Sequence, residues 1–335
     1  MSLNVSNDKK RLSLPEAIIT GDRQKFTEKY NHDSFKFTHN LAGHPLFEIP
    51  RLVELADFLL QQEGRSIQFR GSDRPVDDFG DAQSRNKQRE RLLQELADIR
   101  NSKSWLLLYS VQRKPEYQVL LDQIIGELEQ LTGQDIRSQI TWLDAYIFVA
   151  SPQGITPYHI DHEATFLFQI AGNRTSNLFD GRDRSILKEA EIEKYYIGDF
   201  TAAQYQAEHQ PKSSIYKLTP GTGVHHPPLA PHWYQNGEKY SVALGIHFCL
   251  KDQDRQGKIY QFNYYLRQLG FSPTPPGKSL IKDHLKSLAL ELISTRNPKS
   301  KYELLRSGVD RIKTITSSFK SVSKNLKNLN RGAKP

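Results

Sequence analysis

The sequence predicts a mainly β protein flanked by helices, and two observations support that prediction. Between about residue 140 and residue 250, short apolar runs such as ATFLFQIAG and YSVALGIHFCL are separated by Gly, Pro, Asn and Asp. Closely spaced strands with turn residues between them are typical of an antiparallel sandwich or barrel. Before this segment and after about residue 255, apolar residues recur instead at helical spacing.

The elements before the β segment are expected to be helices with one buried strand. In chain order they are a short helix near residues 14–20, a helix from Pro50, a helix over residues 86–99, a buried strand over residues 105–111 and a helix over residues 115–131. Pro50 suits the first turn of its helix, because that position needs no backbone N–H donor. Gly133 suits the end of the helix over residues 115–131 as a C-cap.

The elements after the β segment are expected to form a helical tail, and a further helix is expected over residues 187–196. A hinge rich in Pro and Gly over residues 273–277 precedes the tail. One apolar stripe then recurs every three or four residues, at Val309, Ile312, Ile315, Phe319, Val322, Leu326 and Leu329. A helix with such a stripe packs against its own protein or a twin subunit, so we expect a homodimer.

The net charge of +8 is placed unevenly along the 335 residues. From Lys278 onward the chain holds fourteen Lys and Arg but four Asp and Glu, so the first 277 residues carry about −2. Two further interpretations of the tail are therefore considered, and both rank below dimerisation. They are an amphipathic helix on an anionic membrane and a nucleic-acid contact through its lysines.

Cysteine content and hydropathy limit the class of protein. Cys249 is a single cysteine, so neither an internal disulfide nor a cysteine-based zinc site can form. No run approaches about 18 consecutive apolar residues, and the first fourteen residues lack the apolar segment of a secretion signal. We therefore expect no transmembrane helix and a cytoplasmic location.

The segment TPYHIDHEATF carries a pair of residues that can bind a metal. His159 and Asp161 are two positions apart, so on a strand their side chains point to the same face. His162 alternates to the other face. A second imidazole would complete a set of two histidines and one carboxylate, which leaves adjacent coordination positions open on Fe(II). The pair alone is also compatible with a histidine that is simply hydrogen-bonded on a polar strand face.

The second imidazole has three candidates in GVHHPPLAPHWYQNG, namely His225, His226 and His232. We favour His232, because it follows a proline-rich turn and enters a new strand near a loop end. For His225 and His226 we expect strand positions near the pocket, one facing in and one facing out.

Three segments together resemble the JmjC family of oxygenases, and within it the branch of the factor-inhibiting asparaginyl hydroxylase. They are HIDHEATFLFQIAGNRTSNLF, TPGTGVHHPPLAPHWYQNG and SVALGIHF, and the match covers roughly residues 140–250. The resemblance implies a double-stranded β-helix (cupin or jelly-roll) core. It also implies Fe(II) held by His159, Asp161 and His232, with 2-oxoglutarate as cosubstrate.

The resemblance also implies a cosubstrate pocket. Arg174 stands fifteen residues after His159, where relatives usually place a Lys that pairs with the distal carboxylate of 2-oxoglutarate; an Arg can grip a carboxylate through two hydrogen bonds. Thr156 matches a Thr that binds the same carboxylate. The other implied positions are Thr165 and His247, where the hydroxylase has Asn, and Tyr109, matched to an upstream Tyr.

The function expected from this resemblance is hydroxylation of a protein or peptide side chain. Three alternatives remain: hydroxylation of a tRNA nucleoside, hydroxylation of a free amino acid or other small molecule, and a non-catalytic cupin that binds a metal and regulates. The expected domains are an N-terminal helical and irregular region (1–104), a JmjC-like catalytic domain (105–265) and a basic helical tail (266–335) that dimerises.

Overall fold

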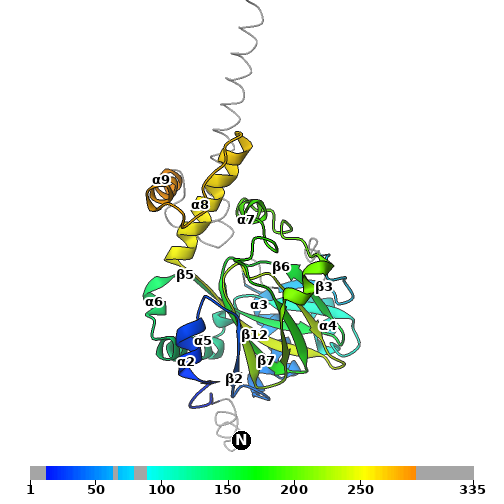
Figure 1. The fold of residues 1–335 in the computed structure, drawn as a ribbon. Coiled ribbons are helices and arrows are strands. Elements are labelled where there is room, and N and C mark those ends of the chain that lie inside the picture. The colour runs from blue at the N-terminus through cyan, green and yellow to red at the C-terminus, as the bar shows by residue number, and fades with distance from the viewer. Residues whose placement is uncertain (1–12, 63–66, 79–88, 292–335) are drawn as a thin grey trace, which may run out of the picture. The chain divides into compact units, whose positions relative to one another are not determined.

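The described part of the chain is built around two antiparallel sheets (Figure 1). The computed structural model describes residues 13–62, 67–78 and 89–291. The large sheet has the order β1 (Ile19–Thr20), β2 (Phe35–His39), β10 (Thr222–His226), β7 (Ala164–Ala171), β12 (Ser241–Leu250), β5 (Ile140–Ala150), β4 (Ser104–Leu108) and β3 (Ile67–Gly71). The small sheet has the order β6 (Ile155–His159), β11 (His232–Asn236), β8 (Arg174–Leu178) and β9 (Ser214–Leu218).

The connectivity of strands β5 to β12 is that of a double-stranded β-helix. Successive strands cross between the sheets: β5, β7, β10 and β12 lie in the large sheet, and β6, β8, β9 and β11 lie in the small one. Side chains alternate between the two faces of each strand, so every second residue points into the space between the sheets. The predicted fold class is therefore confirmed.

Helices that precede β5 in the chain cover the face of the large sheet that points away from this space. The helices of the described residues are α2 (Arg23–Lys29), α3 (Ile49–Leu60), α4 (Arg89–Ala97), α5 (Pro115–Thr132), α6 (Ile136–Gln139), α7 (Glu189–Tyr196), α8 (Lys251–Gln268) and α9 (Leu280–Glu291), with 3-10 turns η1 (Pro45–Phe47), η2 (Val111–Arg113) and η3 (Ala207–Lys212). Apolar side chains of α2, α3 and α5 join those of β7 and β12 in one buried cluster, and α2 and α5 lie together beside the sheet in Figure 1. The expected helices near Pro50 and over 115–131, the C-cap at Gly133 and the buried strand after residue 104 are all confirmed.

The helix expected near residues 14–20 is wrong. The backbone N–H groups of Ile18 and Ile19 donate to the Glu127 carboxylate at 2.9 and 2.6 Å, which holds this segment extended against α5. The helix begins only after Asp22, whose carboxylate accepts the N–H of Gln24 at 2.9 Å as an N-cap.

The N-terminal region also contributes strands that the sequence did not indicate. β1 and β2 extend the large sheet beyond β10, and β3 extends it beyond β4 at the opposite edge. The residues before 105 therefore do more than pack on the core, since they widen the sheet that carries it.

The chain divides into two compact units, one of residues 1–187 with 203–253 and the other of residues 188–202 with 254–335. In the second unit the Arg267 guanidinium donates to both oxygens of the buried Glu193 carboxylate, at 2.8 and 2.9 Å. The expected apolar stripe from Val309 to Leu329 lies outside the described residues. No helix in the described segments is long and apolar enough to cross a membrane.

Candidate metal centre and adjoining cavity

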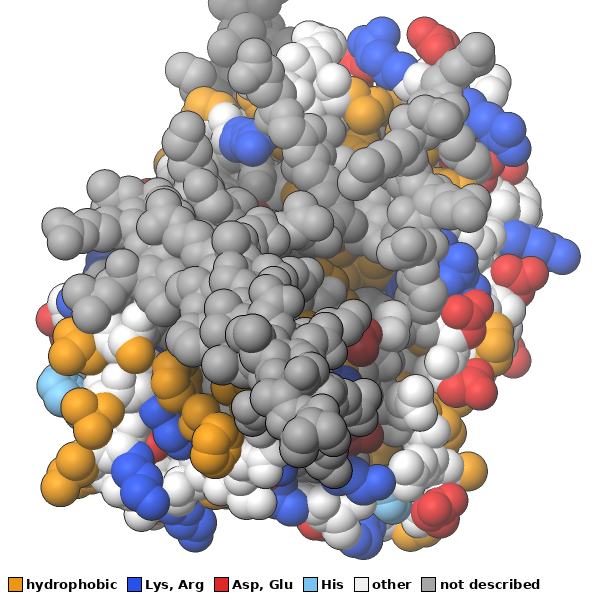
Figure 2. Space-filling view, turned by 90° about the horizontal axis from the view of Figure 1, so that it is seen from above, with side chains coloured by type: hydrophobic (Ala, Val, Ile, Leu, Met, Phe, Trp, Pro, Cys, Tyr) orange, Lys and Arg blue, Asp and Glu red, His pale blue; other side chains and the backbone are white. Residues whose placement is uncertain are grey.

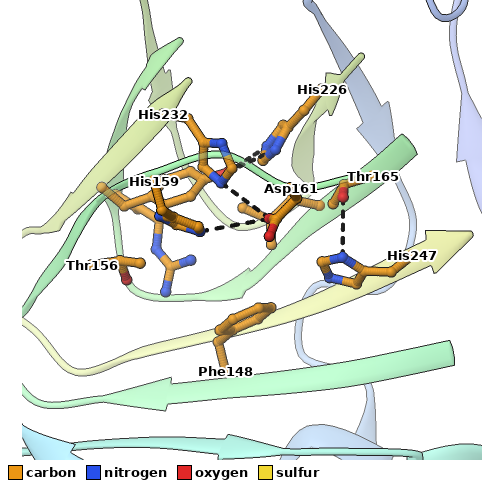
Figure 3. A pocket seen from close by; sticks show the side chains of 11 residues that line it. Phe148, Thr156, His159, Asp161, Thr165, His226, His232 and His247 are labelled. Carbon is orange, nitrogen blue, oxygen red and sulfur yellow. Dashed lines mark hydrogen bonds and ion pairs between the residues drawn. The ribbon is translucent and has the colours of Figure 1, made fainter. Parts of the chain in front are cut away.

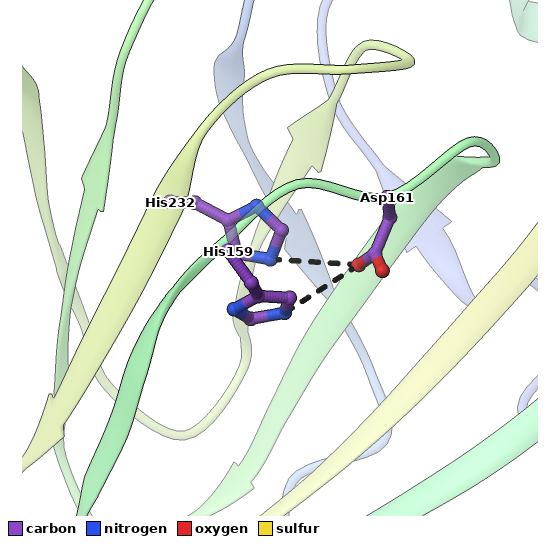
Figure 4. Close-up of side chains that lie close together, drawn as sticks. All are labelled: His159, Asp161 and His232. Atoms are coloured by element: carbon purple, nitrogen blue, oxygen red, sulfur yellow. Dashed lines mark ion pairs between the residues drawn. The ribbon is translucent and has the colours of Figure 1, made fainter. Parts of the chain in front are cut away.

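The side chains of His159, Asp161 and His232 converge, as the sequence predicted (Figure 4). One ligand atom of each lies within 4.8 Å of the other two. The Asp161 Oδ2 atom is 3.6 Å from the Nε2 of His159 and 3.7 Å from the Nε2 of His232. Two imidazole nitrogens and one carboxylate oxygen at this separation form one face of a coordination shell.

Strand pairing brings the two histidines together. His159 ends β6 and His232 begins β11, and the two residues are direct partners across the small sheet. Asp161 follows β6 in a turn, where its carbonyl accepts the N–H of Leu229 at 2.8 Å. The turn before β11 and the turn after β6 are thus tied to each other, which fixes the carboxylate beside both rings.

Backbone carbonyls set the tautomer of both histidines. The Nδ1 of His159 lies 2.7 Å from the carbonyl oxygen of Pro157, and the Nδ1 of His232 lies 2.9 Å from that of Ala230. Because a carbonyl only accepts, each Nδ1 carries the proton and donates, which leaves the Nε2 lone pair for a metal. Such orientation of a ligand through its other ring nitrogen is usual in metal sites.

Electrostatics favour the same neutral state. Burial, together with a smaller effect of the nearby His232, lowers the pKa of His159 to about 3 against the opposing effect of Asp161. Burial also lowers the pKa of His232. Both rings are therefore neutral near pH 7 and available as ligands.

A β-bulge allows Thr156 to share the cavity with His159. These residues are three apart and would face opposite sides of a regular strand. Here His232 pairs with His159 while Tyr234 pairs with Thr156, so β6 holds one residue more than β11 between the two pairs. Tyr158 points away and packs against Phe179, with ring centroids 5.6 Å apart.

A small cavity of about 30 Å³ lies beside the metal centre (Figure 3). Its walls come from both sheets, and they are Phe148, Thr156, His159, Asp161, Thr165, Leu167, Arg174, His226, His232, Tyr234 and His247. The structure thus brings together every predicted site residue except Tyr109. With one guanidinium and one carboxylate among these walls, a bound metal would make the cavity positive and suited to an anion.

Arg174 lies in the cavity wall as a buried cation without an acidic partner among the described residues. It is 3% exposed, its Nε donates to Asn236 Oδ1 at 3.2 Å, and its Nη2 donates to Ser241 Oγ at 3.3 Å. The guanidinium also lies over the Tyr234 ring, 5.2 Å from the centroid. Burial lowers the pKa of Arg174 to about 10, so it stays charged at neutral pH.

The wall opposite the metal ligands contains a second polar group. Thr165 Oγ1 and His247 Nδ1 are hydrogen-bonded at 3.0 Å across β7 and β12 (Figure 3). The buried His247 Nε2 has no hydrogen-bond partner. A polar atom left in this state at a cavity wall is the kind of group that a bound ligand satisfies.

The two adjacent histidines of β10 divide as expected. His226 faces the cavity and is hydrogen-bonded through Nε2 to the hydroxyl of Tyr234. His225 faces the other way, where it stacks on Phe166 with centroids 4.3 Å apart and accepts the N–H of Asn31 at 3.1 Å. His225 therefore holds the N-terminal segment, and His226 belongs to the cavity.

Tyr109 does not line the cavity. Its hydroxyl donates to Gln68 Oε1, and its ring packs edge-on against Tyr146 at 4.8 Å. Tyr146 in turn lies 4.4 Å from the His247 ring, so it stands between Tyr109 and the cavity wall. The resemblance matched Tyr109 to a tyrosine that contacts the cosubstrate, but here the Tyr146 side chain separates Tyr109 from the His247 wall of the cavity.

Sequence reasoning also missed four wall residues as site residues: Phe148, Leu167, His226 and Tyr234. Strand alternation could have found Leu167, which is two positions from Thr165. It could also have found Tyr234, two positions from His232. Phe148 gave no such signal, because β5 holds no predicted site residue.

Comparisons with known proteins find only distant structural matches. No protein-family model matches the chain, and no curated protein matches it. A structure of the ribosomal oxygenase YcfD from Escherichia coli, in complex with cobalt and 2-oxoglutarate, is 16% identical over 84% of this chain and 69% of that chain, with a TM-score of 0.46. A second structure of Escherichia coli YcfD is 15% identical over 84% of this chain and 70% of that one, with a TM-score of 0.46. The DMSP lyase DddQ from Ruegeria pomeroyi is 17% identical over 32% of this chain and 38% of that chain, with a TM-score of 0.21. At these values the site must be judged on its own residues.

Proposed function

We propose that this protein is an Fe(II)- and 2-oxoglutarate-dependent oxygenase that hydroxylates a protein or peptide side chain. One observation carries the proposal. Two histidines and one carboxylate that can bind a metal share a cavity with the buried guanidinium of Arg174, which has no acidic partner among the described residues. The first suits a metal with open positions, and the second suits a small dicarboxylate.

The donor set fits the metal. His159 and His232 offer Nε2 lone pairs with the proton fixed on Nδ1, and Asp161 offers a carboxylate oxygen on the same side. Nitrogen and oxygen donors without thiolate suit Fe(II), although zinc and nickel accept them too. Bound there with 2-oxoglutarate, Fe(II) supplies oxidising chemistry: O2 and 2-oxoglutarate become succinate and CO2 as a substrate C–H becomes C–OH.

The remaining cavity residues would orient the cosubstrate and exclude water. Arg174 can bind the distal carboxylate of 2-oxoglutarate, because hydrogen bonds to Asn236 and Ser241 orient its guanidinium. Among the described residues, no carboxylate pairs with this guanidinium. Thr156 lines the same cavity and adds a hydroxyl. Phe148 and Leu167 supply apolar wall, which strengthens the electrostatic contacts by keeping water out.

A macromolecular substrate fits the exposure of the metal centre. The Asp161 side chain is 24% exposed and that of His159 is 12% exposed, whereas that of His232 is 3% exposed. The site thus opens to solvent on the side of Asp161 and His159. A side chain that projects from a protein surface can reach it there.

The test is anaerobic reconstitution with Fe(II) and 2-oxoglutarate, followed by detection of succinate when oxygen is admitted. We expect succinate from the wild type and a loss of at least about a hundredfold in Asp161→Ala, because removing a ligand costs at least what removing its supporting partner costs. Asp180→Ala is the matched control, since Asp180 pairs with Arg182 outside the cavity.

The outcomes separate the candidate functions. Succinate formation that peptides stimulate, and that tRNA and free amino acids do not, supports the proposed substrate class. Stimulation by tRNA or by a free amino acid alone replaces the peptide with that substrate. If no substrate class supports Fe(II)-dependent consumption of 2-oxoglutarate, the chain is instead a non-catalytic metal-binding cupin.

We also propose that the C-terminal region joins two copies of the chain and that the protein acts in the cytoplasm. The α9 helix exposes an apolar stripe, with Leu280 79%, Ile281 77% and Leu285 59% accessible. An exposed stripe of this kind suits a partner surface. Truncation after Pro276 with mass measurement by light scattering tests the role, and a truncated chain that is still a dimer contradicts it.

A further inference from the structure

A second buried arginine, Arg70 on β3, lies near the metal centre without an acidic partner. It is 5% exposed, its Nε has no hydrogen-bond partner, and among the described residues no carboxylate pairs with it. Arg70 shares this lack of an acidic partner among the described residues with Arg174. The buried Glu193 in the second unit, in contrast, is paired by two hydrogen bonds with Arg267.

The Arg70 side chain stacks on the ring of Trp105. Arg70 and Trp105 are direct partners across β3 and β4, and the guanidinium lies 3.9 Å from the centroid of the Trp105 ring. The Trp105 indole N–H donates to Thr156 Oγ1 at 3.1 Å, and Thr156 lines the cavity. Trp105 therefore connects the Arg70 guanidinium to the cavity wall, because it stacks on the guanidinium and donates one hydrogen bond to Thr156.

The strand that carries Arg70 leads into a segment that lies beside the strand of His159. This segment follows β3 and runs beside β6, since Ile155 N–H donates to Ser72 O at 3.1 Å and Tyr158 N–H donates to Val76 O at 2.7 Å.

A buried cation of this kind is costly to the folded protein. Removing a guanidinium from water is offset only when an anion or several acceptors replace the water. Stacking on Trp105 supplies part of that compensation, but the ring accepts no hydrogen bond in its plane. The edge of the guanidinium, with its Nε–H, remains free for a planar acceptor.

The surroundings favour a small anion over a polyanion. Asp73, Asp77 and Asp78 are exposed on the segment after β3, and Arg74 pairs with Asp78 at 3.5 Å. These carboxylates repel a phosphate backbone. On the face drawn in Figure 2, the Lys and Arg side chains that can be seen are interspersed with Asp and Glu.

We propose that Arg70, held on Trp105, binds a carboxylate of the substrate and so selects acidic substrates for the metal centre. This inference rests on the proposed function only in placing the substrate beside His159. A single carboxylate on a side chain or at a chain end can reach a buried guanidinium and accept two parallel hydrogen bonds from it. Arg174 then binds the distal carboxylate of 2-oxoglutarate, so each arginine binds a different anion.

Trp105 provides a test that does not depend on turnover. The chain has three tryptophans, so protein with labelled indole nitrogens gives one NMR signal each for Trp105, Trp142 and Trp233, and Trp105→Phe assigns the relevant one. With Zn²⁺ and 2-oxoglutarate present, N-acetyl-aspartate N-methylamide is titrated against its neutral asparagine counterpart. We expect the acid to shift the Trp105 signal with an affinity about tenfold higher than the amide, because a charge-assisted hydrogen bond is lost in the amide.

Three variants locate the effect. Arg70→Gln is expected to bind the acid no better than the amide, and Arg70→Lys is expected to retain part of the preference. Arg74→Gln is the matched control, because it removes the same charge four residues away at a position already paired with Asp78, and it is expected to change the affinity less than twofold. The melting temperature of Arg70→Gln is expected to match or exceed that of the wild type, since an uncompensated buried charge is removed.

The same titration can overturn the inference. Equal binding of acid and amide, or wild-type acid binding by an Arg70→Gln variant that melts at a lower temperature, would make Arg70 a packing residue. A stronger response to a short RNA would replace the carboxylate with a phosphate. N-acetylalanine, whose only carboxylate is terminal, distinguishes a chain end or free acid from an acidic side chain. Because Zn²⁺ prevents turnover, the result stands whether or not the chain proves to be an oxygenase.

Discussion

The two faces of the large sheet are made by the same strands and have opposite chemistry. On β7, Phe166 and Phe168 point to the helices, whereas Thr165 and Leu167 point to the cavity. On β12, Leu244 and Ile246 belong to the outer face, with His247 on the inner one. Both faces are almost fully buried, so burial does not distinguish them.

The two faces differ in the role of their buried side chains. Outer side chains fill the space between sheet and helices, and their contribution follows the apolar area removed from water. Inner side chains leave a cavity open and hold polar atoms without partners, such as His247 Nε2. The outer face thus stabilises a cavity whose inner lining is arranged for ligands rather than for stability.

The largest effect that tests this comparison is the loss of an outer aromatic ring. Phe166 is fully buried against Phe26 and Phe248, so Phe166→Ala is expected to lower the free energy of unfolding by about 3–5 kcal/mol. Phe148 is its inner counterpart and already borders the cavity, so Phe148→Ala is expected to cost about half as much or less, because little additional empty volume is created.

Urea unfolding of the metal-free variants measures both costs. Zinc affinity below the transition serves as the control, since neither ring touches the metal centre and both variants should bind zinc as the wild type does. Equal costs for Phe148 and Phe166 would show that the inner face contributes packing energy after all. The distinction between the two faces would then fail.

Much of the fold and of the metal centre could be predicted because both follow from alternation along strands. The convergence of His159 and Asp161 was predicted from a period of two, although Asp161 lies after the end of β6 and its backbone is held there by the N–H of Leu229. The opposite directions of His225 and His226 followed from the same rule. The spacing of short apolar runs between turn residues predicted the two-sheet core.

Strand alternation by itself could not predict the features that depart from regular periodicity. Thr156 shares the cavity with His159 because of a bulge in β6, and an extra residue in a strand leaves no mark in hydrophobic alternation. The strand near Ile19 depends on Glu127, more than a hundred residues away, so a local pattern cannot indicate it. Tyr109 was placed by resemblance, and only the position of Tyr146 shows that it is too far from the cavity.

A smaller effect is expected at Arg174, the inner cation. Arg174→Gln removes the charge but leaves an amide near Asn236 and Ser241, so the concentration of 2-oxoglutarate that half-saturates turnover should rise about 10–100-fold. Zinc affinity is the control, and it should stay within twofold. Arg174→Lys should recover part of the loss, because an ammonium keeps the charge without the planar fork. An unchanged 2-oxoglutarate requirement in Arg174→Gln would remove this residue from the cosubstrate site.

The smallest effect concerns two histidines away from the metal ligands. His39 Nε2 donates to the carbonyl of Gln169 and its Nδ1 accepts the N–H of Leu41, both at 3.1 Å. His225 Nδ1 donates to the carbonyl of Thr165 at 3.0 Å and its Nε2 accepts the N–H of Asn31 at 3.1 Å. Each ring therefore uses one donor and one acceptor, and a second proton would set two N–H groups against each other.

Acid should consequently destabilise the metal-free protein. Burial lowers the pKa of His39 to about 4 and that of His225 to about 3, whereas both titrate near 6.5 in the unfolded chain. Between these values the unfolded chain binds protons that the folded chain does not, so stability is complete above about pH 6.5 and falls as the pH decreases. We expect a loss of about 1–2 kcal/mol per histidine between pH 7 and pH 5, measured by urea unfolding at each pH. His39→Gln should reduce that loss, and His32→Gln, which alters an exposed ring, should leave it unchanged. A pH dependence that His39→Gln does not alter would show that this ring can take up a proton in the folded protein, and the outer face would then tolerate charge as the cavity does.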